Sequence, residues 1–408
     1  MLNVDLKTSK LGFRKGDFPI FFMLLNVFLW YYLTLSMVTS ISSNFNIEYL
    51  QLLPFHSAGV IIAGIVGLLF SKTRYRLLLS WTFLGTVTSL VPILTSISTL
   101  PYFQLICFAW GFSFGLGMPL CLGYFTENIT IENRGRFSGL LFLVSFFCAI
   151  PIAGLARTFG LAFLYLISGL WRMLGFVPLL ILQPDKIIVE FKKKARKYSV
   201  PMLYDRRLYL YLIPWFMFNI IDKLEELLLR NFVENLFPQH YASMQLITLL
   251  FLSIFAFLGG LLSDLIGRKP VIIFGFSTMG IAYAIISIIP NALPAWFFFF
   301  ISNGLAWGVF YPILVASIWG DLAPRGSEEK YYFVGNLPLF LATIIQLFFS
   351  FYVTFLNETS AFSLAAFFLF LAVLPILFAP ETLPERKIRE RELRKYIEKA
   401  KKIKEKYT

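Results

Sequence analysis

The stretch GGLLSDLIGRK, Gly259 to Lys269, decides the fold because it sets an acid, a turn and two bases between two long apolar runs. An apolar run that stops at Gly267, Arg268 and Lys269 and then resumes is typical of two membrane helices joined by a short turn. The two cations alone would anchor such a turn at the membrane surface. Asp264 is not needed for that purpose, so its presence requires a second explanation.

The composition extends this interpretation to the whole chain. The chain has 408 residues, of which 58% are hydrophobic and 14% charged, and its mean hydropathy is +0.73. A soluble domain carries about 25% charged residues, and a spanning helix needs about 20 apolar residues. The sequence predicts an all-α membrane protein with twelve spans, near 18–42, 52–70, 77–97, 102–126, 137–157, 161–183, 207–229, 241–263, 270–290, 294–318, 331–355 and 361–380.

The net charge of +13 is a topology signal. If the first run starts inside, 32 of the 36 Lys and Arg residues fall in inner segments. This asymmetry predicts a multi-pass protein of the cell (plasma) membrane with both termini in the cytoplasm. Because the basic residues follow the turns, nucleic acid is not expected as a partner. The three cysteines lie inside apolar runs and the two histidines are far apart, so neither a metal nor a cofactor is expected.

The chain contains an internal repeat. Shifting the sequence by 193 residues superimposes IIAGIVGLLF (61–70) on IFAFLGGLLS (254–263). The same shift pairs Gly111 with Gly304, Gly115 with Gly308, Pro119 with Pro312 and Asn26 with Asn219. Ungapped matches of this kind predict a duplicated six-helix unit. We expect bundles at 1–183 and 207–380, a basic linker at 184–206 and a basic cytoplasmic tail at 381–408.

Glycine and proline form one stripe on each of two runs. Gly111, Gly115 and Pro119 are four residues apart and share a helix face, as do Gly304, Gly308 and Pro312. Small residues at this spacing allow close helix packing, whereas proline removes a backbone hydrogen bond and permits bending. Both roles remain open from the sequence.

These features together resemble the major facilitator superfamily. The turn signature of that family matches Gly260, Asp264, Gly267, Arg268 and Lys269, and the two six-helix halves cover nearly the whole chain. Two shorter stretches add to the likeness: RGR (134–136) follows the fourth run, and APET (379–382) follows the twelfth run as in sugar-porter-like members. The resemblance implies a transporter in which two bundles rock about a central cavity.

The resemblance also gives Asp264 a role as a gating latch. In the family, the eighth helix faces the fifth across the two halves, and the fifth helix begins near Ser138 with partial positive charge at its N-terminus. Asp264 is expected to contact that helix end and Arg134 or Arg136. At the shift-related positions of the first half, Ser71 replaces the acid and Arg74 replaces the turn glycine, so the latch is expected on one side only.

The seventh run carries charges where lipid is expected. If it enters near Arg207, Asp222 lies about 20 Å deep in a core about 30 Å thick. Glu226 and Arg230 are four residues apart and are expected to pair, whereas Lys223 falls off their face. Asp222, Glu225 and Glu226 are therefore candidates for binding a proton or a cationic or hydroxyl-rich solute. Alternatively, the membrane helix ends near Ile221 and an outer amphipathic helix follows.

Three further polar residues lie inside apolar runs. Asn26 and Asn219 are related by the repeat, and they predict either a shared midplane site or a bond between helices. Arg172 lies near the middle of the sixth run. It could pair with Asp222, but a partner within the first half is favoured because the sixth helix is peripheral in the family.

The sequence therefore predicts a monomeric secondary transporter, not an enzyme, that moves a small solute by alternating access. Proton-coupled symport is the first choice, because the seventh run offers carboxylates, and uniport is the second. Two other functional classes fit the sequence less well. A membrane-embedded lipid-linked glycosyltransferase would need paired carboxylates in a large outer loop, and a non-transporting solute sensor would need a partner for its tail. Neither class accounts for the duplicated architecture.

Overall fold

The computed structural model describes residues 14–95, 97–184, 202–353 and 357–383, and within these ranges the regular elements are all helical. The first half contains α1 (Phe18–Phe45), α2 (Leu53–Leu69), α3 (Arg74–Leu94), α4 (Leu100–Gly115), α5 (Met118–Asn128), α6 (Arg134–Phe159), α7 (Leu161–Met173) and α8 (Phe176–Leu182). The second half contains α10 (Arg206–Leu236), α11 (Pro238–Ile266), α12 (Arg268–Ile288), α13 (Leu293–Phe310), the π-helical segment η5 (Tyr311–Val315), α14 (Ile318–Leu322), α15 (Glu328–Val353) and α16 (Glu358–Phe378). Short 3-10 turns η1 (Lys15–Asp17), η2 (Tyr49–Gln51), η3 (Ser71–Thr73) and η4 (Met202–Tyr204) join or precede helices.

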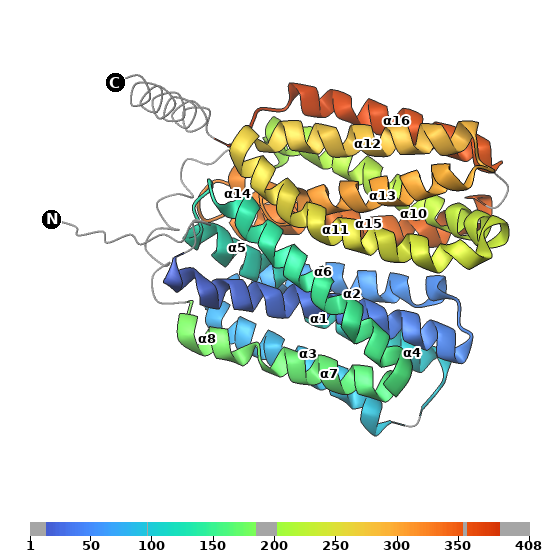
Figure 1. The fold of residues 1–408 in the computed structure, drawn as a ribbon. Coiled ribbons are helices and arrows are strands. Elements are labelled where there is room, and N and C mark those ends of the chain that lie inside the picture. Colours follow the sequence, from blue (N-terminus) through green and yellow to red (C-terminus); the bar gives the residue numbers. More distant parts are fainter. Residues whose placement is uncertain (1–13, 96, 185–201, 354–356, 384–408) are drawn as a thin grey trace, which may run out of the picture.

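The helices form two groups that lie side by side (Figure 1). One group contains α1 to α8 and the other contains α10 to α16. Three spans are each built of consecutive pieces, namely α4 with α5, α7 with α8, and α13 with η5 and α14. Twelve spans in two six-helix bundles result, as the sequence predicts. We call the side on which α1 begins and α16 ends the basal side, and the opposite side the distal side.

Eleven of the twelve spans are long and apolar enough to cross a membrane by composition alone, within the part of the chain that the structure describes. The exception is α10, which carries the charged residues of the seventh run. It continues as one helix from Arg206 to Leu236. The helix does not break near Ile221, but whether its membrane part ends there stays a prediction.

The two glycine stripes lie in equivalent helix contacts. A Cβ atom at Gly111 or Gly115 would collide with the backbone carbonyls of His56 and Val60 on α2. A Cβ atom at Gly304 would collide with the Thr248 carbonyl on α11. Each stripe therefore brings the fourth helix of its half against the second helix, closer than any side chain would allow.

Both of these spans also depart from α-helical geometry near their prolines. The fourth span changes from α4 to α5 at Leu116 and Gly117, immediately before Pro119. The tenth span passes through the π turn that contains Pro312 before α14 begins. Loss of a backbone donor at proline accounts for the interruption in each case. A change of bend during function stays a prediction.

The basal end of α10 is fixed by its N-cap, Asp205. The Asp205 carboxylate accepts hydrogen bonds from the backbone and side chain of Arg207 and from the Tyr331 hydroxyl of α15. Burial raises the pKa of Asp205, but these hydrogen bonds outweigh burial and lower it below the ordinary value. Most of the predicted linker (184–206) and most of the predicted tail (381–408) lie outside the described residues, so the proposed domain limits stay a prediction.

Candidate functional site

A cavity of about 900 Å³ lies between the two bundles toward the distal side. Residues of α1, including Tyr31 and Thr39, line one wall, and residues of α13, including Asn303 and Trp307, line the opposite wall. The cavity reaches Asn219 at its deep end and Glu234 near the distal end of α10. Its lining combines tyrosine, tryptophan and phenylalanine rings with hydroxyl, amide and charged groups.

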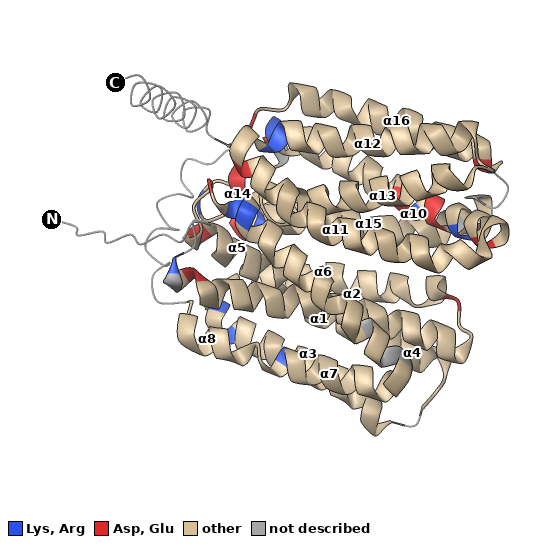
Figure 2. Ribbon diagram, viewed as in Figure 1, with Lys and Arg blue, Asp and Glu red and all other residues tan. Residues whose placement is uncertain are grey.

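The charged face of α10 lines this cavity. Asp222, Lys223, Glu226 and Arg230 all contribute to the wall. Figure 2 shows these charges on α10, apart from the larger group of charges at the basal end around α5 and α14. Two of the three carboxylates that the sequence singles out thus reach the cavity, namely Asp222 and Glu226.

The pairing within α10 differs from the prediction. Lys223 Nζ lies 2.7 Å from Glu226 Oε2, and Arg230 Nε lies 3.1 Å from Glu234 Oε1. Glu226 and Arg230 therefore do not pair with each other, and Lys223 lies on the cavity face. Sequence spacing allowed both arrangements, because residues three and four apart are neighbours on a helix.

Asp222 has a different environment. Its Oδ1 accepts a hydrogen bond from Trp307 Nε1 at 3.0 Å, and among the described residues no ion pair includes it. Within the described part of the chain, Asp222 is thus a cavity carboxylate without an ion pair of its own, although Lys223, which pairs with Glu226, also attracts it.

Glu225 lies on another face of α10 and does not line the cavity. Its side chain is 8% exposed, and its Oε2 has no hydrogen-bond partner within the described part of the chain. A buried carboxyl group in this position is less costly as the neutral acid than as the anion.

The two repeat-related asparagines occupy different environments. Asn219 lines the cavity, whereas Asn26 is buried in the first bundle and accepts a hydrogen bond from Arg172 Nη1 at 2.8 Å. The Arg172 guanidinium also lies over the Trp81 ring at 4.0 Å and the Trp30 ring at 5.1 Å. Arg172 therefore has its partners within the first half, and neither it nor Asn26 reaches the cavity.

Asp264 binds the N-terminal end of α6 across the bundle interface. Its carboxylate accepts hydrogen bonds from the backbone nitrogens of Gly135 at 2.9 Å and Arg136 at 2.7 Å, and Arg136 Nε lies 3.2 Å away. Arg268 Nη1 approaches the same carboxylate at 2.5 Å from within α12. Asp264 and Arg268 are both fully buried. The helix-end contact expected from the sequence is present, and its side-chain partner is Arg136.

Arg134 instead pairs with Asp321 of α14, at 2.7 Å. Asp321 also accepts from Arg268 Nε at 3.2 Å, so it links the same buried cation to a second cross-bundle pair. Sequence reasoning missed Asp321, although an acid at the polar end of the tenth run is a signal that could have been used. Glu381 was also missed, although it lies in the quoted APET stretch, and it accepts from the backbone nitrogens of Arg268 and Lys269 at 2.9 and 3.0 Å.

A second contact between the bundles is present at the basal end, on the side where the sequence predicted none, and a gating role for either contact stays a prediction. Arg74, at the position related to Gly267, forms a bidentate pair with Glu127 and a further ion pair with Glu329 in the first turn of α15. Ser71 occupies the position related to Asp264. The first half therefore uses a cation at the turn and an acid at the facing helix, which is the reverse of the polarity around Asp264.

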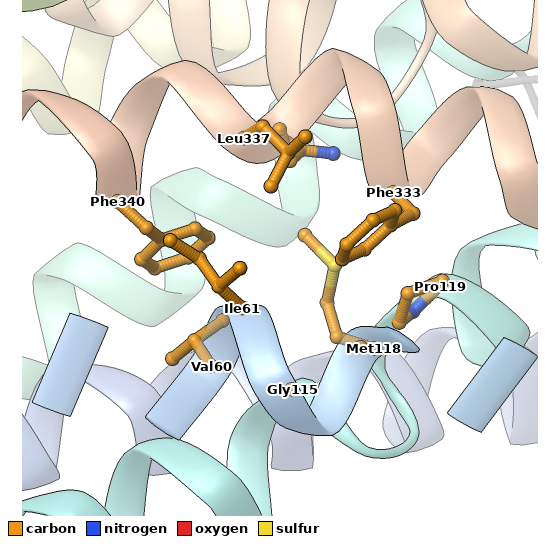
Figure 3. A pocket seen from close by; sticks show the side chains of 10 residues that line it. Val60, Ile61, Gly115, Met118, Pro119, Phe333, Leu337 and Phe340 are labelled. Carbon is orange, nitrogen blue, oxygen red and sulfur yellow. The ribbon is translucent and has the colours of Figure 1, made fainter. Parts of the chain in front are cut away.

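Apolar packing continues the basal closure up to the floor of the cavity. Phe340 of α15 lies beside Val60 and Ile61 of α2, and Phe333 of α15 lies beside Met118 of α5 (Figure 3). The space left among these side chains is only about 10 Å³. Phe340 also lines the large cavity. The solvent space between the bundles therefore ends at this seam.

The described residues contain no group of three or more His, Cys, Asp and Glu side chains that could hold a metal ion. The expectation of no metal or cofactor stays a prediction.

Comparison with known proteins identifies the family. The model of the Major Facilitator Superfamily matches residues 200–406, half of the chain. No curated protein matches the chain in sequence. Among solved structures, the human organic anion transporter MFSD10 (TETRAN) is similar with a TM-score of 0.69 and 13% identity, covering 88% of this chain and 98% of that chain. The proton:xylose symporter XylE bound to 6-bromo-6-deoxy-D-glucose is similar with a TM-score of 0.66 and 17% identity, covering 90% and 96%. At such identities the likeness shows the fold alone, whereas the family match extends over the second bundle, so the chain belongs to the major facilitator superfamily.

Proposed function

We propose that the protein moves a small solute across a membrane by alternating access, driven by protons moving in the same direction. The observation that carries this proposal is the pairing of a large distal cavity with a basal end closed by cross-bundle contacts. Such a molecule exposes a midway site to one compartment only. Rocking of the bundles would expose the site to the other compartment.

The basal contacts are the proposed gating latch. Asp264, Arg136 and the N-terminus of α6 form one part, and Arg74 with Glu329 forms the other. Each joins one bundle to the other without a covalent link. The latch must stabilise the basally closed state over the open state by only a few kcal/mol, because a larger difference would hold the protein in one state. By the distribution of basic residues, the basal side faces the cytoplasm of the cell and the cavity opens outward.

Two carboxyl groups of α10 have separate roles in the proposed transport, one toward the solute and one toward the proton. Asp222 faces the cavity and is placed to contact the solute. Glu225 is buried beside that wall and is placed to hold the coupling proton as a neutral acid. Because the two groups lie only three residues apart on one helix, movement of α10 would change the surroundings of both.

Proton coupling predicts a specific transport phenotype for Glu225→Gln. In proteoliposomes given a panel of labelled sugars, organic acids and amines, a gradient of one pH unit should drive about tenfold accumulation of the transported solute at one proton per solute. An uncoupler should abolish the accumulation but not exchange. Glu225→Gln should exchange the solute but not accumulate it, as the wild type does with uncoupler, because glutamine mimics the neutral acid and releases no proton.

The matched control is Glu48→Gln, which removes an exposed carboxylate on the distal side outside the cavity lining. It should accumulate solute as the wild type does. Accumulation that survives the uncoupler in the wild type would exclude proton coupling, and equilibration without accumulation would establish uniport.

A further inference from the structure

The charged side chains that line the cavity are three acids, Asp222, Glu226 and Glu234, and two cations, Lys223 and Arg230, so the lining has one acid more than it has cations. Lys223 is paired with Glu226 and Arg230 with Glu234, so both cavity cations are already bound to acids of the same helix. Asp222 accepts a hydrogen bond from the neutral indole N–H of Trp307, and the nearby ammonium of Lys223, which attracts it electrostatically, is hydrogen-bonded to Glu226. The cavity therefore offers a ligand a negative charge without a competing free positive charge.

Aromatic rings surround this part of the cavity. The indole of Trp307 donates to Asp222, and its ring lies 5.2 Å from the ring of Tyr311, centroid to centroid. On another part of the lining, the rings of Tyr31 and Phe340 meet edge to face with their centroids 6.3 Å apart. Faces of such rings carry negative electrostatic potential and attract an organic cation, while their surfaces bury its apolar body.

A second acceptor lies one helical turn from Trp307. Asn303 lines the cavity from α13, and its Oδ1 is buried without a hydrogen-bond partner in the described ranges. An unpaired buried acceptor is costly until a donor reaches it. An ammonium group supplies up to three donors and one positive charge, whereas a carboxylate ligand supplies neither.

We propose that the cavity selects a small organic cation, namely an ammonium compound with an apolar or aromatic body, and that Asp222 is its anchoring residue. This inference rests on the proposed transport function, since it assigns the substrate class of the same cavity. An anionic solute would meet Asp222 without a free cation to balance it. A neutral polyol would leave the Asp222 charge partly desolvated and unmatched, because its hydroxyl groups carry no charge.

Three ligands that differ mainly in charge test the proposal. These are 2-phenylethylamine, which is cationic at pH 7, 2-phenylethanol, which is neutral, and 3-phenylpropanoate, which is anionic. Binding to the purified full-length protein in lipid nanodiscs is measured by isothermal titration calorimetry and by thermal stabilisation. The amine should bind at least about tenfold more tightly than the other two, because a hydrogen bond between an ammonium group and a carboxylate is stronger than one between neutral groups.

Variants locate the effect at Asp222. Asp222→Asn should weaken binding of the amine at least about tenfold and leave the alcohol within about twofold. Glu48→Gln removes the same charge from the distal surface and should change neither ligand. The ranking of the three ligands on the wild-type protein is independent of whether Asp222→Asn folds.

The proposal is overturned if the alcohol or the propanoate binds as tightly as the amine, or if Asp222→Asn retains amine binding. Absence of binding by all three at about 10 mM also overturns it, since even millimolar affinity is only about 4 kcal/mol. The proposed function is tested separately by solute flux and by opening of the basal side. If the bundles rock but the protein does not prefer a cation, only the proposed substrate class is refuted. If the protein binds the cation but its basal side never opens, only the proposed transport function is refuted.

Discussion

Replacing Asp264 by asparagine is expected to open the basal side of the protein in most molecules. The carboxylate accepts from two backbone N–H groups at the start of α6 and from Arg136, so its loss removes charge-assisted contacts that exist only while the bundles are closed. Asparagine keeps one acceptor but turns an amide donor toward another donor. Removing one partner of a buried hydrogen-bonded ion pair costs about 3–5 kcal/mol. We expect about 2–4 kcal/mol of this cost to raise the free energy of the closed state relative to the open state.

Distances between spin labels measure this shift directly. Gly16→Cys in the first bundle and Arg325→Cys in the second place exposed labels at the basal end, in a protein whose three cysteines are replaced by alanine. Double electron–electron resonance should show a longer basal distance as the main population in Asp264→Asn and a minor one in the parent. An unchanged distribution would remove Asp264 from the latch.

A glycine pair on α6 provides the control. A Cβ atom at Gly135 would collide with the Gly260 carbonyl and the Ser263 hydroxyl, whereas a Cβ atom at Gly154 would meet nothing within 4 Å. Gly135→Ala should therefore lengthen the basal distance as Asp264→Asn does, and Gly154→Ala should not. Both variants carry the same chemical change on the same helix, so a difference between them reports the cross-bundle contact.

Replacing Arg74 by glutamine is expected to weaken the same closure from the other side of the interface. Arg74 is 3% exposed and holds Glu127 and, across the interface, Glu329. Without the guanidinium, two carboxylates remain close together with no balancing charge from this site. Leaving a buried charge unpaired costs about 3–5 kcal/mol, so the basal distance should again lengthen in most molecules.

Arg76→Gln is the matched control, because it removes an exposed cation from the same turn of α3. It should leave the distance distribution unchanged. The double variant Arg74→Gln with Glu329→Gln should regain part of the population with the short basal distance, because it also removes one of the two acids that lose their partner. If Arg74→Gln keeps the parent distribution, the reversed contact has no gating role.

The sequence was sufficient for the fold because its signals are local. Each span except the seventh is a continuous apolar run, so the number of spans follows from neighbouring residues alone. The orientation that the basic residues indicate stays a prediction. The contact between Asp264 and the start of α6 was also predictable, but only through the family resemblance, which supplies the facing of the eighth and fifth helices.

The partners of the buried charges could not be predicted because they are distant in sequence. Arg134 and Asp321 are 187 positions apart, and Arg74 and Glu329 are 255 positions apart. The repeat suggested equivalent residues in both halves, yet the second contact has the opposite polarity, and Asn26 is buried while Asn219 lines the cavity. Duplication conserves backbone packing, as the glycine stripes show, but it does not fix which charged side chains meet.

The pairing on α10 was ambiguous for a different reason. Glu226 has Lys223 three residues before it and Arg230 four residues after it, and both spacings bring side chains together. The choice depends on which groups the cavity hydrates and which other helices approach. Only the three-dimensional structure shows that both cations pair with glutamates and that Asp222 has no ion pair among the described residues.

In alternating access, the two bundles open the cavity to one side of the membrane while they close it to the other. Two label pairs in the full-length protein in nanodiscs test it most directly: the basal pair at positions 16 and 325, and a distal pair made by Asn44→Cys and Asn291→Cys. We predict that Asp264→Asn, relative to the parent, lengthens the basal distance and shortens the distal distance together. Distances that stay fixed on both sides, or that lengthen on both sides at once, would contradict alternating access in this protein.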